Sequence, residues 1–547
     1  MARRQLFIPF FVLVVAAVLR MAYLDLKPPH FDEGINGWWC DEMARRGFYA
    51  YDPSNYHGPL HFYVLFVFLR VLGRNLWALR LPVVIIGTAT IGLVLAFRRR
   101  LGTGVAWLTA GALAISPGYV FYDRYSIHEA WLVFFLILAF WALCRLAAAG
   151  RNRSRDWTAT WALVLSVAGM ILTKETYVIH LAAAVLAGIF ILAITPAADR
   201  RRALPWLQAD PTACLGSGLV AVALIVFFYS GNFLHFAGLR GLFETFTPWT
   251  KTGIESAGHG KPEYDLFALV PTRLATIGPF TKLQAFRVNW YWVKLLTIYE
   301  WFALAGVVLS LRYLWTGRRA LRFLSVYAWL ALIAYSLIPY KTPWCIISIA
   351  WPFFFLAAAG LIWLRDLAVF LLGAAGLRRR RDLAGFVLVA VPTAGLLGHD
   401  AWRMFRLNFK EYDNPRQMYA YVQTYRDYKQ FAGPILREVA LHPQLKERMK
   451  GNILLSSYFP MPWTLGDIQH IGYYSTNESW PKDLDADFIV AEDASTQEVE
   501  SGLTQSYFER PFRLRDGMDL CRAFYRCETF KDVFPNRQPD FVPDQSQ

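Results

Sequence analysis

Apolar runs separated by short polar or basic segments make up most of the first 400 residues. A helix needs about 20 apolar residues to cross the roughly 30 Å hydrocarbon core of a bilayer. The pattern therefore predicts an α-helical polytopic membrane protein with about eleven spans. The predicted spans are residues 6–24, 78–97, 102–122, 126–147, 157–173, 176–195, 213–231, 294–315, 322–339, 343–364 and 383–401.

Arginine clusters predict how these spans are oriented. They lie at 98–100, 151–155, 200–202, 318–319 and 378–381. Because basic loops tend to stay in the cytoplasm, all five clusters fit an N-terminus inside and a C-terminus outside. The outer side then carries residues 25–77, 123–125, 174–175, 232–293, 340–342 and 402–547.

Three apolar segments need separate interpretation. Residues 59–73 would form a helix only about 22 Å long, and counting them as a span would place the arginines at 98–100 outside. We interpret them as an interfacial or re-entrant helix. Residues 366–376 are also short and are either interfacial or an extension of the preceding helix. The run at 6–24 lacks a clean cleavage site, which favours an uncleaved first span.

The chain after residue 401 contains no spanning run. A helical stretch around 415–449 is followed by β-like runs at 453–458, 487–491 and 512–526. This order predicts a small extracytoplasmic α/β domain. The expected domains are therefore a membrane domain, 1–401, and a soluble domain, 402–547.

Composition and charge agree with a membrane protein. Of the 547 residues, 56% are hydrophobic and 18% charged, and the net charge is +15. The arginines lie between apolar runs, as membrane topology requires, so we expect no nucleic-acid partner. The six cysteines form no CxxC motif or Cys/His cluster that would indicate structural zinc. Cys521 and Cys527 could form a disulfide if the tail is extracytoplasmic.

Two polar groups in the first outer loop are candidates for chemistry. Asp32 and Glu33 follow the first span and lie near two tryptophans. A carboxylate at the membrane surface beside aromatic residues is suited to act as a base or ligand. Asp32 is equally well explained as a helix N-cap. His57 could bind a divalent metal ion, although a single loop histidine is more often a hydrogen-bonding residue.

The second outer loop places four ionisable side chains at the start of a span. Arg124, His128 and Glu129 belong to the segment Tyr122–Glu129. Ionisable groups this close to the membrane are candidates for function. The alternative for Glu129 is a structural role, because a helix N-terminus favours an anion.

Two lysines at the outer ends of spans oppose the positive-inside tendency. Lys174 and Glu175 stand between two spans with almost no loop, and Lys341 lies in Tyr340–Trp344. Such lysines suit an anionic partner such as a lipid phosphate. The alternatives are a local pair of Lys174 with Glu175, and an ordinary interfacial aromatic belt around Lys341.

Together these motifs resemble membrane glycosyltransferases of the GT-C fold. They are an Asp-Glu pair after the first span, a Pro-Leu start to an interfacial helix, an Arg-x4-acid motif and a Thr-Lys at a later span end. More narrowly, residues 1–400 resemble the protein-mannosyltransferase and aminoarabinose-transferase superfamily, in its prokaryotic form similar to glycosyltransferase family 39. The tail resembles the C-terminal domains of that group mainly in Tyr458–Trp463.

The resemblance implies roles for individual residues. Asp32 matches the catalytic acid and Glu33 its neighbour, while Arg124 and Glu129 match the arginine and acid of the second loop. Glu129 stands where the family often has Asp. Further on, Lys174 matches the lysine that meets the lipid phosphate, Lys341 matches a late basic residue, and His128 and Glu175 belong to the same substrate region. His57 falls where relatives have a glutamate before Lys-Pro, and this chain has His-Gly-Pro.

The implied reaction moves a hexose or pentose from a polyprenyl-phosphate donor to an acceptor hydroxyl, with inversion, at the outer face of the plasma (inner) membrane. In this scheme Asp32 takes the acceptor proton, Lys174 holds the phosphate, and Glu129 with His57 holds a divalent metal ion or orients Asp32. The acceptor is left open between protein, lipid and glycan. A transporter or flippase for lipid-linked sugars, and a non-catalytic assembly protein, are the alternatives; a transporter would place ionisable residues at the bilayer midplane.

Overall fold

The computed structural model describes residues 2–149, 156–197, 200, 209–255, 259–266, 288–374 and 381–543. The arginines at 151–155, 201–202 and 378–380, which we expect in the cytoplasm, lie outside these residues. The chain divides into two compact units. The first unit comprises Met1–Ala22, Gly47–Gly73 and Arg80–Lys410; the second comprises Tyr23–Arg46, Arg74–Leu79 and Glu411–Gln547.

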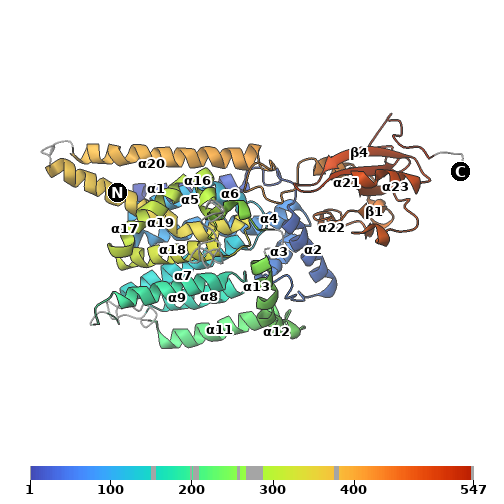
Figure 1. The fold of residues 1–547 in the computed structure, drawn as a ribbon. Helices are drawn as coiled ribbons and strands as arrows, with labels where there is room; N and C mark the ends of the chain where they lie inside the picture. The colour runs from blue at the N-terminus through green and yellow to red at the C-terminus, as the bar shows by residue number, and fades with distance from the viewer. Residues whose placement is uncertain are drawn as a thin grey trace, which may run out of the picture. The chain divides into compact units, whose positions relative to one another are not determined.

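The first unit is a bundle of helices whose long members run side by side (Figure 1). Its helices are α1 (Ala2–Met21), α3 (Leu60–Leu72), most of α4 (Leu76–Leu95), α5 (Thr103–Ile115), α6 (Pro117–Tyr122), α7 (Glu129–Ala149), α8 (Trp157–Ile171), α9 (Tyr177–Ala193), α11 (Pro211–Tyr229), α12 (Ala237–Glu244), α13 (Phe246–Glu255), α16 (Tyr291–Tyr299), α17 (Trp301–Trp315), α18 (Arg319–Leu337), α19 (Ile346–Ala374) and α20 (Arg381–Phe405).

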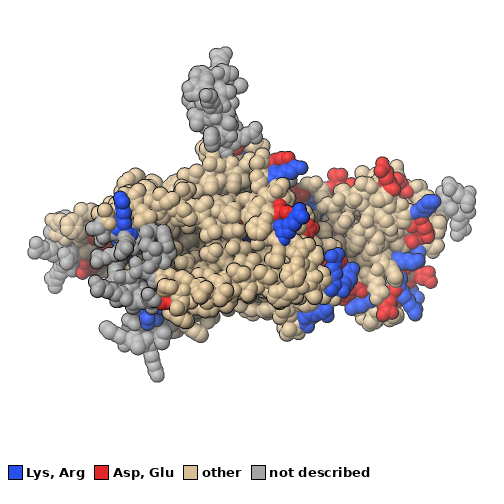
Figure 2. Space-filling view, turned by 90° about the horizontal axis from the view of Figure 1, so that it is seen from below, with Lys and Arg blue, Asp and Glu red and all other residues tan. Residues whose placement is uncertain are grey.

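Helix α19 forms the centre of this bundle. Every residue from Ile346 to Leu361 is buried, and α19 packs against α5, α7, α17, α18 and α20. A helix that is apolar on all sides is stable where other helices or lipid surround it, and α19 is surrounded by helices. The outer helices instead expose apolar side chains, so the flank seen in Figure 2 shows few charged residues. The helices are those of an integral membrane protein.

Six helices of the described residues are long and apolar enough to cross a membrane, judged by length and composition. They are Leu76–Arg99, Glu129–Ala148, Pro211–Tyr229, Arg319–Leu337, Pro343–Ala374 and Asp382–Lys410. Shorter apolar helices occupy five other predicted spans, so the count of eleven stays a prediction. Helix α3, at 13 residues, is about 20 Å long, and the segment at 366–376 extends α19.

Two predicted spans are wrong as single helices. The run at 102–122 breaks at Ser116, which is extended before Pro117, because a residue before proline disfavours the helical conformation. The run at 294–315 breaks at Glu300, which is also non-helical. The Glu300 carboxylate accepts hydrogen bonds from Ser116 Oγ at 2.8 Å and Gly118 N at 2.6 Å. One buried acid therefore satisfies the start of α6 and stabilises both breaks.

The second unit is a small α/β domain, as predicted. Its helices are α2 (Phe31–Arg46), α21 (Tyr428–Leu441), α22 (Met461–Thr464) and α23 (Thr496–Ser501). Its strands are β1 (Lys450–Leu454), β2 (His470–Tyr473), β3 (Phe488–Glu492), β4 (Tyr507–Arg513) and β5 (Leu520–Arg526), in the order β2-β1-β3-β5-β4. Strands β2, β1 and β3 are parallel, and β5 is antiparallel to both β3 and β4.

Three expectations for the tail are corrected. The run at 512–526 is the β4–β5 hairpin rather than one strand, because the chain turns at Gly517 with a φ of 75°, a conformation that glycine tolerates. The helix expected at 415–449 covers only Tyr428–Leu441, since Pro443 starts a separate turn. Cys521 and Cys527 are both free thiols; six residues along an extended strand place them about 20 Å apart, too far for a disulfide.

We expect Glu300→Ala to destabilise the bundle by about 2–4 kcal/mol, because it leaves a buried hydroxyl and a buried N–H without an acceptor. Thermal unfolding of the purified protein in detergent measures the effect. Glu255→Ala, at an exposed position at the end of α13, is the matched control and should change stability by no more than about 0.5 kcal/mol. Equal unfolding temperatures for the two variants would contradict the capping role of Glu300.

Candidate functional site

Five buried or half-buried ionisable side chains gather in the first unit, and we refer to them as the Lys174 cluster. His57 precedes α3, His128 and Glu129 stand at the start of α7, and Lys174 with Glu175 lies between α8 and α9. All except His57 are buried. Three segments that are distant in the sequence therefore contribute side chains to one cluster.

Gly58 allows the segment before α3 to approach the segment between α8 and α9. Its N–H donates to Thr173 O at 3.1 Å, and Leu60 N donates to Leu172 O at 3.0 Å. A Cβ on Gly58 would lie only 2.3 Å from the Leu172 carbonyl carbon. Only glycine fits this backbone contact, and the contact brings His57 to the residues that follow α8.

Ion pairs hold the centre of the cluster. Lys174 Nζ lies 2.8 Å from Glu129 Oε1 and 3.7 Å from Glu175 Oε1, and all three side chains are at most 5% exposed. Burial alone would lower the pKa of Lys174, but the two carboxylates outweigh it and hold the pKa well above its usual value. Burial would raise the pKa of Glu175, but Lys174 and His57 hold it below its usual value. Lys174 and Glu175 are therefore charged at neutral pH.

The histidines complete the cluster on one side. His57 Nδ1 donates to Glu175 Oε2 at 2.9 Å, and the His57 and His128 rings are 4.6 Å apart. His128 Nε2 is buried without a hydrogen-bond partner among the described residues. Such an atom is costly to leave unpaired and marks a place for a ligand.

His61, which the sequence analysis did not select, also packs against His128. Its ring lies 4.4 Å from that of His128. Trp131 Nε1 donates to His61 Nδ1 at 3.1 Å, and His61 Nε2 contacts Ser126 Oγ at 2.9 Å. Because indole N–H can only donate, Nδ1 of His61 carries no proton. His61 is therefore a neutral packing residue rather than a charged one.

The residues expected to hold a divalent metal ion, His57 and Glu129, belong to no close group of three ligand atoms in the part of the chain that the structure describes. The orphaned His128 Nε2 and the Glu129 carboxylate are of the types that zinc and manganese accept. A metal ion there would share Glu129 with Lys174. A separate group in the second unit, Glu438, His442 and Asp532, has ligand-type atoms within 4.8 Å of one another; the sequence analysis did not identify it.

Arg124 holds together the first unit rather than facing the Lys174 cluster. Its Nη1 donates to Leu19 O at 2.8 Å and to Ala22 O at 2.6 Å, so it caps the end of α1. Arg20 of α1 pairs in turn with Asp123 at 2.7 Å and donates to Ala114 O, near the end of α5, at 3.3 Å. Carbonyls at a helix C-terminus need donors and favour cations. The two arginines thus fasten α1 to the second outer loop.

Lys341 is used in the same way. It is fully buried, and its ammonium donates to Tyr335 O at 2.7 Å and to Ser336 O at 3.2 Å, at the end of α18. Burial, offset in part by Asp265, lowers the pKa of Lys341 to about 8. Its hydrogen-bonding capacity serves the helix end, and of the two outer lysines only Lys174 has carboxylate partners in the described residues.

Asp32 belongs to the second unit, where it is the second residue of α2. Its side chain is 34% exposed, and no described residue donates a hydrogen bond to its carboxylate. Asp32 N donates to His30 Nδ1 at 3.1 Å, while His30 Nε2 donates to Tyr421 O at 3.0 Å. His30 Nδ1 therefore carries no proton, and its 3.8 Å contact with the Asp32 carboxylate is not an ion pair.

Glu33 has a structural position. It is fully buried, and its Oε2 accepts the backbone N–H of His30 at 2.9 Å. This hydrogen bond closes the first turn of α2, as a side chain in the first turn does in a capping box. Of the Asp-Glu pair, Glu33 fixes the start of the helix and Asp32 is left accessible.

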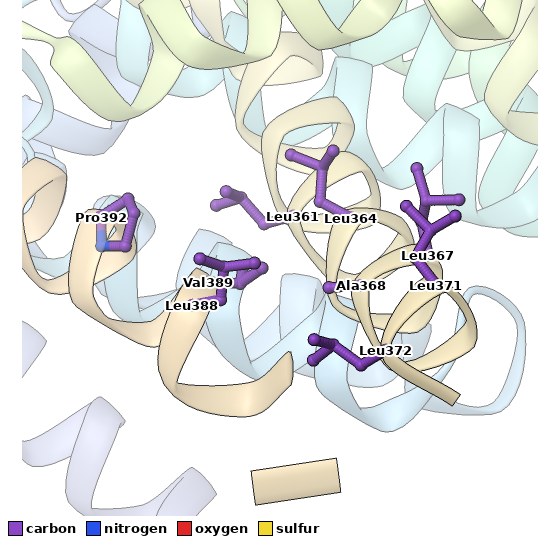
Figure 3. A pocket seen from close by; sticks show the side chains of 9 residues that line it. All are labelled: Leu361, Leu364, Leu367, Ala368, Leu371, Leu372, Leu388, Val389 and Pro392. Atoms are coloured by element: carbon purple, nitrogen blue, oxygen red, sulfur yellow. The ribbon is translucent and has the colours of Figure 1, made fainter. Parts of the chain in front are cut away.

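A cavity of about 400 Å³ lies between α19 and α20 in the first unit (Figure 3). Nine residues line it, and none is polar: Leu361, Leu364, Leu367, Ala368, Leu371, Leu372, Leu388, Val389 and Pro392. Such a lining suits hydrocarbon and offers no group for phosphate or sugar chemistry. The Lys174 cluster is therefore the stronger candidate for chemistry in this unit.

One protein-family model matches part of the chain. Residues 56–229 match the family model described as dolichyl-phosphate-mannose-protein mannosyltransferase. This segment contains the whole Lys174 cluster and Arg124, whereas Asp32 and Lys341 lie outside it. No curated protein sequence matches the chain significantly.

Solved structures share the fold along nearly the whole chain. ArnT from Cupriavidus metallidurans, solved bound to undecaprenyl phosphate, matches with a TM-score of 0.56 and 16% identity over 94% of this chain and 97% of that one. An oligosaccharyltransferase from Archaeoglobus fulgidus, tethered with an acceptor peptide, matches with a TM-score of 0.55 and 13% identity over 92% and 72%. The same archaeal enzyme, solved with Zn and sulfate, matches with a TM-score of 0.50 and 14% identity over 93% of this chain and 73% of that one.

We expect Lys174→Met to destabilise the protein by about 3–5 kcal/mol, because it leaves buried carboxylates without their counter-charge. Adding Glu129→Gln should recover at least about 1 kcal/mol of that loss in a double-mutant cycle. The exposed pair Arg240–Glu244, 84% and 46% exposed, is the control and should show a coupling of about 0.5 kcal/mol or less. Equal coupling in the two cycles, measured by thermal unfolding in detergent, would refute a buried Lys174 ion pair.

Proposed function

We propose that the chain is a membrane glycosyltransferase that transfers a sugar from a polyprenyl-phosphate donor to an acceptor hydroxyl. Its fold is similar to that of ArnT, and residues 56–229 match the mannosyltransferase family model. We place the reaction at the outer face of the plasma (inner) membrane, with the N-terminus cytoplasmic and the second unit extracytoplasmic. The arginine clusters between spans support this orientation. The sugar is a hexose or pentose, and the acceptor is a protein, a lipid or a glycan.

The observation that carries the proposal is the buried, charged Lys174 within the segment that matches the mannosyltransferase family. Keeping an ammonium ion buried is expensive, and a functional ligand is one reason to retain it. The undecaprenyl phosphate bound to the Cupriavidus ArnT supports a lipid phosphate as that ligand. The apolar flank of the helices suits the prenyl chain, which needs hydrocarbon surroundings.

The proposed reaction is a single displacement that inverts the anomeric carbon. The acceptor oxygen forms a bond to that carbon while the bond to the phosphate oxygen breaks, and polyprenyl phosphate leaves. Lys174 stabilises the negative charge that grows on the departing phosphate, and such preorganised charges often supply the largest catalytic effect. Glu129 and Glu175 keep Lys174 protonated and in place.

Asp32 is the proposed general base, which takes the proton of the acceptor hydroxyl. Its carboxylate is one-third exposed and accepts no hydrogen bond from the described residues, so it is available to a hydroxyl group. Glu33 holds the helix start by accepting the His30 N–H, and the Asp32 N–H donates to His30 Nδ1. Arg124 and Lys341 contribute to the fold that supports the reaction.

His57, His128 and Glu129 would hold a divalent metal ion if one takes part. When bound, it would neutralise negative charge on the phosphate oxygens. The archaeal enzyme was solved with Zn and sulfate, which supports a divalent metal ion in this proposal. The residues of this chain still supply Lys174 for the phosphate and Asp32 for the proton.

A transporter or flippase for lipid-linked sugars, and an assembly protein that keeps the scaffold, are the competing functions. Both could bind a polyprenyl-phosphate sugar, but neither would need a proton acceptor. The loss or retention of transfer after removal of the Asp32 charge therefore separates the enzyme from both.

We expect Asp32→Asn to reduce sugar transfer by about 100-fold or more, as the loss of a general base does, with little change in stability because the carboxylate has no structural partner. Transfer of radiolabelled sugar by the purified protein measures the effect. Asp25→Asn, at an exposed position in the same unit, is the control and should keep full activity. Unchanged transfer in a folded Asp32→Asn protein would contradict the assignment.

A further inference from the structure

Helix α2, which carries Asp32, belongs to the same compact unit as the C-terminal residues 411–547. It has two interior glycines, Gly34 and Gly37, each of which disfavours an isolated helix by about 1 kcal/mol. A 16-residue helix of this composition is marginal by itself in water. The order of α2, and with it the position of Asp32, therefore depends on what packs against it.

One face of α2 is buried against the C-terminal segment Tyr458–Trp463. Glu33, Asn36, Cys40 and Met43 recur at helical spacing on that face, and α2 packs against α22. A Cβ added to Gly34 would lie 2.5 Å from Pro460 Cα, and a Cβ added to Gly37 would lie 2.3–2.5 Å from the Trp463 ring. The two glycines leave the space that these two residues fill.

Both ends of α2 are fastened to the same tail. At the start, Phe31 packs edge-on against Phe459 with ring centres 5.7 Å apart, and the Arg515 guanidinium stacks 4.7 Å over Phe31. Arg515 also donates to Phe459 O at 2.8 Å, which fixes the tail segment itself.

At its other end, α2 is joined to the tail through Arg74. Two nitrogens of Arg74 donate to the Asp41 carboxylate at 2.9–3.1 Å. Its guanidinium also donates to Trp463 O and lies 3.3 Å from Asp467. Such a bidentate pair fixes orientation as well as distance. Arg74 therefore holds Trp463 where its ring fills the space beside Gly37.

The segment before α2 is attached in the same way. His30 Nε2 donates to Tyr421 O at 3.0 Å, Gln423 donates to Pro28 O at 3.3 Å and Lys429 donates to Leu26 O at 3.3 Å. The backbone on the N-terminal side of Asp32 is thus tied to residues some 390 to 400 positions later in the chain. Asp32 itself stays off this packed face and remains one-third exposed.

We propose that the C-terminal domain sets the position of Asp32, and that Gly34 and Gly37 with Pro460 and Trp463 are positioning residues for the transfer. This inference rests on the proposed role of Asp32 as the base. A catalytic group must be held close to its productive geometry, and a displacement of about 1 Å can cost a factor of about 100 in rate. The domain thereby acts on the reaction through α2, without contacting the reacting atoms.

Gly37→Ala tests this inference, because its methyl group collides with the Trp463 ring and must displace α2 or the tail. We expect kcat to fall about 10- to 100-fold, with the KM for the polyprenyl-phosphate sugar unchanged, since Lys174 is untouched. Adding Trp463→Leu makes room for the methyl group and should restore part of kcat. Gly433→Ala, at a position in α21 with nothing within 4 Å of the new Cβ, should leave kcat and KM unchanged.

Hydrogen–deuterium exchange of residues 31–46 gives a readout that does not depend on activity. Gly37→Ala should speed exchange in α2 while β1 and β3 stay protected. Adding Trp463→Leu to Gly37→Ala should slow the exchange in α2 again. Unchanged exchange in α2, or faster exchange with full kcat, would overturn the inference. If Gly37→Ala does not fold, Trp463→Ala should give the same faster exchange and the same fall in kcat. Failure of the wild-type protein to transfer sugar would instead refute the proposed function, and the exchange test would stand.

Discussion

The buried ion pairs of Lys174 with Glu129 and Glu175 are the interaction on which the first unit's chemistry depends. An ammonium ion shielded from water needs acceptors within a few ångströms, and here two carboxylates supply them from the starts of α7 and α9. The cluster can form only if α3, α7, α8 and α9 keep their places. Gly58 makes that possible by letting the backbone before α3 touch the end of α8.

The other cations of the outer loops show what a structural role looks like. Arg20, Arg124 and Lys341 each donate to carbonyls at or near the end of a helix, which the partial negative charge of a helix C-terminus favours. Lys174 lies against two carboxylates, Glu129 and Glu175, whereas Arg20 combines its carbonyl contacts with one carboxylate, Asp123.

Apolar periodicity was enough to predict the membrane class, most helices and a small α/β tail. The helix breaks at Ser116 and Glu300 were missed because both lie inside apolar runs. Pro117 marks the first break, but the acid that caps it, Glu300, lies far away in the sequence, so their contact is not visible there. Sequence also identified most members of the Lys174 cluster, since they stand at span ends. It could not assign Lys341 to a cap or Asp32 to the same unit as the tail, because both depend on contacts between distant segments. One informative residue was overlooked: Arg20, a charged side chain inside an apolar run, indicates a buried polar contact within the membrane domain.

The central claim is that Lys174 forms the binding site for a lipid phosphate, and binding of polyprenyl phosphate to a charge-balanced variant tests it most directly. Lys174→Gln with Glu129→Gln removes one positive and one negative charge, so the net charge of the cluster is unchanged, and Glu175 keeps its hydrogen bond from His57. Titration calorimetry in detergent should find affinity reduced at least about tenfold, the loss of about one charge-assisted hydrogen bond. Wild-type affinity in the folded double variant would contradict the account.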